Sequence, residues 1–127
     1  MIYSVLDWNN DFECRVYKKD WLDSFLRKNK KKTGNKNIDR KLTITTKSVH
    51  VKNIIDTEVA ATFMQLTKQI MPVQLIIQDN YLPTIKDLTG KKVIGIETSQ
   101  WIYKHNDVDA LLKYGEEIMS RIKDTNF

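Results

Sequence analysis

Residues 73–78 read VQLIIQ, and this short, almost wholly apolar run decides the fold that we expect. A continuous apolar run of four to eight residues is typical of a strand that is covered on both faces. Asp79 and Asn80 follow it, and both residue types favour turns, so they end the strand. We therefore place Val73–Gln78 at the centre of a β-sheet.

The segments on either side of this run predict the layers around it. Before it, Thr57–Ile70 carries Val59, Phe63, Leu66 and Ile70 at helical spacing, with Asp56 or Thr57 as the cap and Pro72 beyond the end. After it, Lys92–Glu97 (KVIGIE) is typical of a neighbouring strand. The core of the fold is thus predicted to be a helix followed by two strands.

The C-terminal segment predicts the longest helix. Asp107 is the expected cap, and one apolar stripe follows it, consisting of Val108, Leu111, Leu112, Gly115, Ile118, Met119 and Ile122. A glycine inside a helix costs about 1 kcal/mol relative to alanine. Its place on the stripe therefore predicts tight packing of Gly115 against another element.

The N-terminal half adds further strands. Ile2–Trp8 and Phe12–Tyr17 surround the turn-forming Asn9-Asn10-Asp11, which predicts a β-hairpin. In Leu42–Thr46, Leu42, Ile44 and Thr46 alternate with the residues between them, as in a half-buried strand. Val49 and Val51 alternate in the opposite phase, so we expect two strands joined by a turn at Lys47–Ser48. Strands that follow one another directly favour antiparallel pairing.

The fold class that we expect is therefore α+β. Residues 1–127 form a single domain with a five- or six-stranded, mainly antiparallel sheet and helices packed on one face. A further helix is predicted from Trp21 into the basic stretch that follows, ending near Thr33–Gly34.

Positive charge is concentrated in one stretch, Arg27–Lys41, which reads RKNKKKTGNKNIDRK. Eight of its fifteen residues are Lys or Arg, and Asp39 is its one acidic residue. The whole chain has 21 basic and 16 acidic residues, so the remainder has 13 basic and 15 acidic residues. A basic loop over residues 27–41 on a nearly neutral body is the feature most indicative of function.

Concentrated Lys and Arg attract polyanions, and the partner that we expect is nucleic acid, RNA or DNA, held through its phosphates. The candidate binding residues are Arg27, Lys28, Lys30, Lys31, Lys32, Lys36, Arg40 and Lys41. Trp8, at the tip of the predicted hairpin, is a further candidate for contact with a partner. The competing interpretation is structural, since a charge run also forms a solvated loop, and lysines favour the last turn of a helix.

Two other functions fit the same sequence. The chain can be an inhibitor, immunity or regulatory protein that docks on an acidic partner, because a basic patch also steers protein association. It can also be a small metal-dependent nuclease that uses Asp79, Glu97 or the acids near His105. No catalytic motif supports an enzyme over a binding protein.

Other classes of function lack their signatures. Cys14 is the one cysteine, and His50 and His105 are the two histidines, at spacings that suit no metal, so we expect no metal or cofactor. No apolar run approaches the roughly 18 residues of a membrane span, and the first residues do not resemble a signal peptide. We therefore expect a cytoplasmic protein with no contact to membranes.

Overall fold

The structure is a computed structural model of the 127-residue chain. The residues that it describes are 2–6, 8, 11–18, 30–31, 34–48, 50–70, 73–79, 91–98 and 105–125. The predicted start of a helix at Trp21 lies outside these residues.

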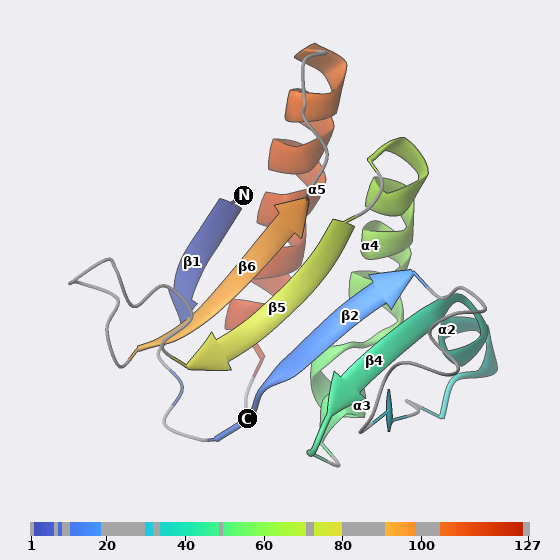
Figure 1. Ribbon diagram of the computed structural model, residues 1–127, viewed down its shortest axis with the longest axis vertical. Helices are drawn as coiled ribbons and strands as arrows, with labels where there is room; N and C mark the ends of the chain where they lie inside the picture. Colours follow the sequence, from blue (N-terminus) through green and yellow to red (C-terminus); the bar gives the residue numbers. More distant parts are fainter. Residues whose placement is uncertain are drawn as a thin grey trace.

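The described residues form one six-stranded sheet in the order β1-β6-β5-β2-β4-β3, and every neighbouring pair is antiparallel (Figure 1). The strands are β1 (Ile2–Leu6), β2 (Cys14–Lys18), β3 (Lys30–Lys31), β4 (Leu42–Thr46), β5 (Val73–Asp79) and β6 (Lys92–Thr98). The α+β fold and the antiparallel sheet expected from the sequence are confirmed.

Strand β5 occupies the central position predicted for VQLIIQ. It pairs with β2 on one side and with β6 on the other. Leu75 and Ile77 are buried on one face of the sheet, and Ile76, which points to the opposite face, is only 1% exposed. The apolar run therefore reflects burial on both faces, as expected.

The predicted N-terminal hairpin is wrong. Strand β1 pairs with β6 at one edge of the sheet, and β2 lies between β5 and β4. The chain must therefore pass the ends of β6 and β5 on its way from β1 to β2 (Figure 1). Phe12, just before β2, is 1% exposed, so its side chain anchors this connection in the core.

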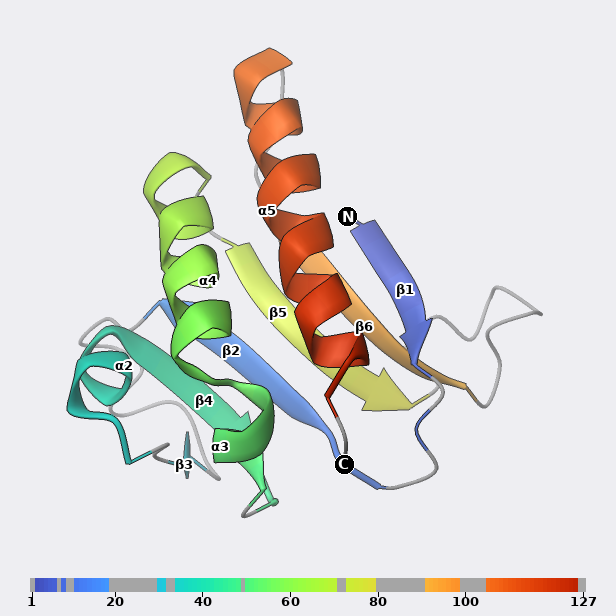
Figure 2. The same cartoon turned by 180° about the vertical axis from the view of Figure 1, so that it is seen from behind.

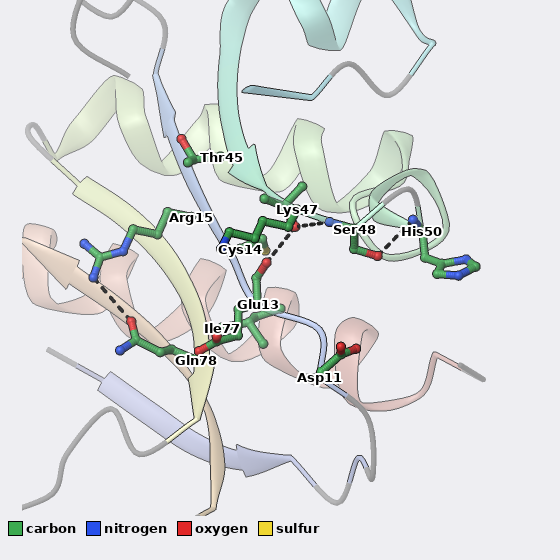
Figure 3. A pocket seen from close by; sticks show the side chains of 11 residues that line it. Asp11, Glu13, Cys14, Arg15, Thr45, Lys47, Ser48, His50, Ile77 and Gln78 are labelled. Atoms are coloured by element: carbon green, nitrogen blue, oxygen red, sulfur yellow. Dashed lines mark hydrogen bonds between the residues drawn. The ribbon is translucent and has the colours of Figure 1, made fainter. Parts of the chain in front are cut away.

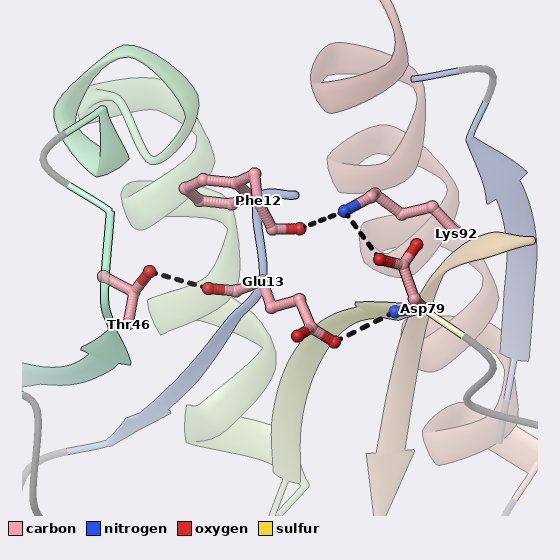
Figure 4. A network of polar contacts seen from close by, with 5 residues as sticks. All are labelled: Phe12, Glu13, Thr46, Asp79 and Lys92. Carbon is pink, nitrogen blue, oxygen red and sulfur yellow. Dashed lines mark hydrogen bonds and ion pairs between the residues drawn. The ribbon is translucent and has the colours of Figure 1, made fainter. Parts of the chain in front are cut away.

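Polar contacts hold this crossover against the strand ends that it passes (Figure 4). Lys92, the first residue of β6, donates from its Nζ to the carbonyl oxygen of Phe12 at 2.5 Å. The backbone N–H of Asp79, the last residue of β5, donates to Glu13 Oε2 at 3.1 Å. Thr46 at the end of β4 donates from its Oγ1 to the carbonyl of Glu13 at 2.6 Å. Three strand ends are thus tied to one connection.

Helices α4 (Thr57–Gln69) and α5 (His105–Lys123) pack together on one face of the sheet (Figure 2). Asp56 caps α4, since its side chain accepts a hydrogen bond from the backbone N–H of Val59, which confirms the prediction for this helix. Their apolar faces and the facing strand residues form the hydrophobic core.

The long helix α5 begins at His105, two residues before the predicted cap. Most of its apolar stripe is buried, but Val108 and Leu112 are 38% and 43% exposed, so the prediction is wrong for these two residues. Both belong to the N-terminal half of α5. The N-terminal end of this helix extends beyond the sheet (Figure 2). The predicted tight packing of Gly115 is confirmed, because a Cβ there would collide with Ile2 Cδ1 of strand β1.

Two other segments differ from their predictions. Val51–Ile54 forms the short helix α3 rather than a strand. Both end residues are buried, and their three-residue spacing suits one face of a helix. Within the basic stretch, Lys30–Lys31 is the edge strand β3 and Lys36–Lys41 is helix α2, so the expected loop over residues 27–41 and the helix running to Thr33 are wrong at these positions.

Candidate functional site

The basic stretch lies at the β3 edge of the sheet. The backbones of Lys30 and Lys31 pair with Thr45 and Ile44 of β4, and α2 leads directly into β4. Arg27, Lys28 and Lys32 lie outside the described residues. Two described segments of the basic stretch, β3 and α2, therefore adjoin the same strand, β4 (Figure 1).

Helix α2 is held in place by its own termini. The Asn35 side chain accepts hydrogen bonds from the backbone N–H groups of Asn37 and Ile38, at 3.0 and 3.4 Å. Gly34 adopts φ +91°, a conformation that favours glycine, and its N–H donates to Asp39 Oδ2 at 3.2 Å. Ile38 is 3% exposed and joins the hydrophobic core. The short helix thus has a cap, a preceding turn and an apolar anchor.

This anchoring leaves the positive side chains of α2 on the surface. Lys36, Arg40 and Lys41 are all exposed, and we call these three residues the basic cluster. Lys36 and Arg40 are four residues apart and therefore neighbours on one side of the helix. Among the described residues, the ion pairs involve Lys92, His105 and Arg121, and none involves the basic cluster.

A hollow of about 740 Å³ opens where β2 begins and where β4 and β5 end (Figure 3). Its lining residues are Asp11, Glu13, Cys14, Arg15, Thr45, Thr46, Lys47, Ser48, His50, Ile77 and Gln78. The lining combines two cationic side chains, two carboxylates, an imidazole, hydroxyl groups and an amide. Its volume is within the range of about 300–1,000 Å³ that is usual for small-molecule sites.

Hydrogen bonds fix much of the wall of the hollow. Arg15 Nη2 donates to Gln78 Oε1 at 3.3 Å, across strands β2 and β5. On the opposite side, the backbone N–H of Ser48 donates to Thr46 Oγ1, and that of His50 donates to Ser48 Oγ, both at 3.1 Å. The segment that follows β4 is thus tied into two successive side-chain turns.

One polar atom in this wall lacks a hydrogen bond. Thr45 Oγ1 is buried and has no hydrogen-bond partner in the part of the chain that the structure describes. Buried hydroxyl groups without a partner are costly and uncommon in native proteins. Thr45 also pairs through its backbone with Lys30, so the hollow and the basic stretch meet at this residue.

Burial makes Cys14, in the same wall, a weak nucleophile. The thiol is 3% exposed, and burial raises its pKa from 9.0 to about 12, although the positive charge of Lys92 acts in the opposite direction. The thiolate is the reactive form of cysteine. Cys14 is therefore a core residue and not a catalytic thiol at neutral pH.

The residues proposed for a nuclease do not come together. Asp79 pairs with Lys92 in the sheet, whereas Glu97 pairs with Gln74, at the other end of the same two strands. Five residue steps along β6 separate the two positions, a distance of about 17 Å between their backbones. His105 Nε2 lies 3.5 Å from Asp109 Oδ2, and both side chains are exposed. Across the described residues, no three His, Cys, Asp or Glu side chains are placed to hold a metal ion.

Trp8 does not lie at a hairpin tip. Its ring is half-buried against the hydrophobic core and packs edge-on against Phe12, with 6.0 Å between ring centroids and 70° between planes. This geometry is that of a packed aromatic pair in the crossover. The structure therefore accounts for Trp8 through packing.

The hollow was not predicted from the sequence. A signal was present in Thr43-Ile44-Thr45-Thr46-Lys47-Ser48, where hydroxyl side chains recur along a strand and one cationic residue, Lys47, lies among them. Other residues of the lining, among them Arg15 and Gln78, are far away in the sequence and come close to this segment only through the strand order.

Comparison with known proteins adds no family. No protein-family model matches this chain, and no curated protein and no solved structure matches it. Among the described helices, none combines the length and the apolar character needed to cross a bilayer.

Proposed function

We propose that this chain is a non-catalytic binding protein that contacts nucleic-acid phosphates through its basic stretch. Lys36, Arg40 and Lys41 of the basic cluster make these contacts, together with Lys30 and Lys31 of β3. Arg27, Lys28 and Lys32 add charge from the same stretch. Because phosphates are the same in every sequence, the binding discriminates little between sequences.

The observation that supports this proposal is the exposure of the basic cluster on an anchored helix. Three cationic side chains lie within six residues, and no ion pair among the described residues neutralises them. The one acidic residue of the basic stretch, Asp39, accepts a hydrogen bond from Gly34. Like charges on adjacent helical turns repel each other, and a bound phosphate relieves that repulsion.

The test is a charge-neutralised variant with a matched control. The variant Lys36→Gln/Arg40→Gln/Lys41→Gln removes the basic cluster, and Lys52→Gln/Lys68→Gln/Lys113→Gln removes the same charge from exposed positions on α3, α4 and α5. Fluorescence anisotropy with a labelled oligonucleotide at low salt measures the affinity. We expect the first variant to bind at least about tenfold more weakly and the control to bind within about threefold of the wild type.

Equal losses in the two variants would contradict a localised site, because they would mean that net charge alone governs the binding. An acidic protein is the other partner that this charge pattern suits. If the wild-type chain retains no oligonucleotide but captures an acidic protein that nuclease treatment does not release, the nucleic-acid proposal is wrong.

A further inference from the structure

The hollow at the end of β4 has a mixed lining that indicates the class of its ligand. Arg15 and Lys47 supply positive charge, whereas Asp11 and Glu13 supply negative charge on another part of the wall (Figure 3). A bare phosphate would be attracted by the first pair and repelled by the second. A ligand that carries an anionic group and also N–H or O–H donors satisfies both. A nucleotide has this combination, in its phosphate, its ribose hydroxyls and its base.

The wall also holds polar groups that can accept or donate further hydrogen bonds. The guanidinium of Arg15 has five N–H donors, of which one bonds to Gln78. A ligand in the hollow can accept hydrogen bonds from the donors that remain.

The hollow is continuous with the basic stretch along strand β4. Lys41 is the last residue of α2, and Thr45 lies four residues further along the chain, a distance of about 13 Å at the rise of a strand. Between them, the backbone of β3 runs beside β4 at Ile44 and Thr45. A chain of phosphates that begins at the basic cluster can therefore pass Lys30 and Lys31 and reach the hollow.

We propose that the hollow takes up one nucleotide of a single-stranded nucleic acid whose neighbouring phosphates lie on the basic stretch. Lys47 and Arg15 bind the phosphate of this nucleotide, and Glu13 and Asp11 face the donors of its ribose and base. A base in a duplex is stacked and paired, so it cannot enter the hollow. The site thus selects single strands, an inference that rests on the proposed function.

The experiment compares single-stranded and duplex DNA of the same sequence, about 12 nucleotides long. The variant Lys47→Gln alters the hollow, and Lys68→Gln on α4 matches it in charge and exposure. We expect Lys47→Gln to weaken single-strand binding by roughly threefold to tenfold and duplex binding by less than about twofold. Lys68→Gln should leave both affinities within about twofold of the wild type.

A second measurement uses small probes and needs no variant. Titration of the wild-type protein with a nucleoside 5′-monophosphate should shift the backbone amide resonances of Thr45, Thr46, Lys47 and Ser48 in NMR spectra. Inorganic phosphate should shift them much less, because the carboxylates oppose it. Equal shifts with the two probes would overturn the nucleotide assignment.

The two proposals fail in different ways. If single strands and duplexes bind equally and Lys47→Gln behaves like Lys68→Gln, the hollow is not a nucleotide site, although the basic cluster still binds phosphates. If the wild-type protein binds neither nucleic acid at low salt, both proposals are wrong.

Discussion

The thiol of Cys14 gives the molecule a predictable response to alkaline pH. In the folded protein its pKa is about 12, whereas in the unfolded chain it returns to the ordinary value of 9.0. Between these two values, the unfolded state has lost the proton and the folded state has kept it. The unfolded state therefore binds fewer protons, and the free energy of unfolding decreases as the pH rises through this window.

We expect the contribution of this one group to decrease by up to about 1.4 kcal/mol per pH unit above the unfolded pKa. Urea unfolding of the wild type and of Cys14→Ala at several pH values from 8 to about 10.5 measures the difference. The free energy of the wild type should decrease more steeply than that of Cys14→Ala. Parallel curves would show that the thiol ionises equally in both states.

Lys92 and Asp79 should contribute unequally to stability, although they form an ion pair at 3.5 Å. The Lys92 side chain is 1% exposed and also bonds to the Phe12 carbonyl, whereas the Asp79 side chain is 48% exposed. Lys92→Ala removes a buried stem and leaves the carbonyl without its donor, so we expect a loss of about 2–4 kcal/mol. Asp79→Asn should cost less than about 1 kcal/mol, because water screens its charge.

Chemical denaturation of the two variants checks this asymmetry. A larger loss in Asp79→Asn than in Lys92→Ala would mean that the ion pair, and not the bond to the crossover, stabilises this end of the sheet.

At the scale of single elements, the contact between α5 and β1 is a tight packing constraint. Gly115 has no Cβ, and Ile2 Cδ1 occupies the space that one would need, with Ile96 Cδ1 next to it at 3.3 Å. We expect Gly115→Val to cost at least about 2 kcal/mol by overpacking, despite the poor helix propensity of glycine. Gly115→Ala should cost less, because the end of the Ile2 side chain can move and alanine favours the helix.

A double-mutant cycle with Ile2→Ala measures this contact. In the Ile2→Ala background, Gly115→Val should be less destabilising than in the wild type by about 1 kcal/mol or more. Additive losses would show that the valine is accommodated without touching β1.

The sequence predicted elements better than it predicted how they pair. The long periodic segments, α4 and α5, and the apolar strand β5 are present close to their expected bounds. The hairpin prediction failed because turn-forming residues such as Asn9-Asn10-Asp11 indicate only that the chain changes direction. They do not indicate which strand pairs with the one before them. Alternation around His50 misled for a different reason, since four residues are too few to separate the period of a strand from that of a helix.

At the scale of the whole molecule, the strand order creates what the sequence could not predict. Arg15 of β2, Thr45 of β4 and Gln78 of β5 line one hollow because these three strands are neighbours. Strands β5 and β6 are also neighbours, but they are antiparallel, so Asp79 and Glu97 lie at opposite ends of the pair. The concentration of charge, in contrast, is a local property of the chain and is visible without the fold.

The most direct test of this account is the salt dependence of oligonucleotide binding by the wild type and by Lys36→Gln/Arg40→Gln/Lys41→Gln. Each phosphate contact contributes about 0.7 to the slope of log K against log salt for single strands. We therefore predict a steep decrease in wild-type affinity with salt and a slope that is shallower by up to about 2 in the variant. The same slope in both proteins, or wild-type affinity that does not change with salt, would contradict binding through these side chains.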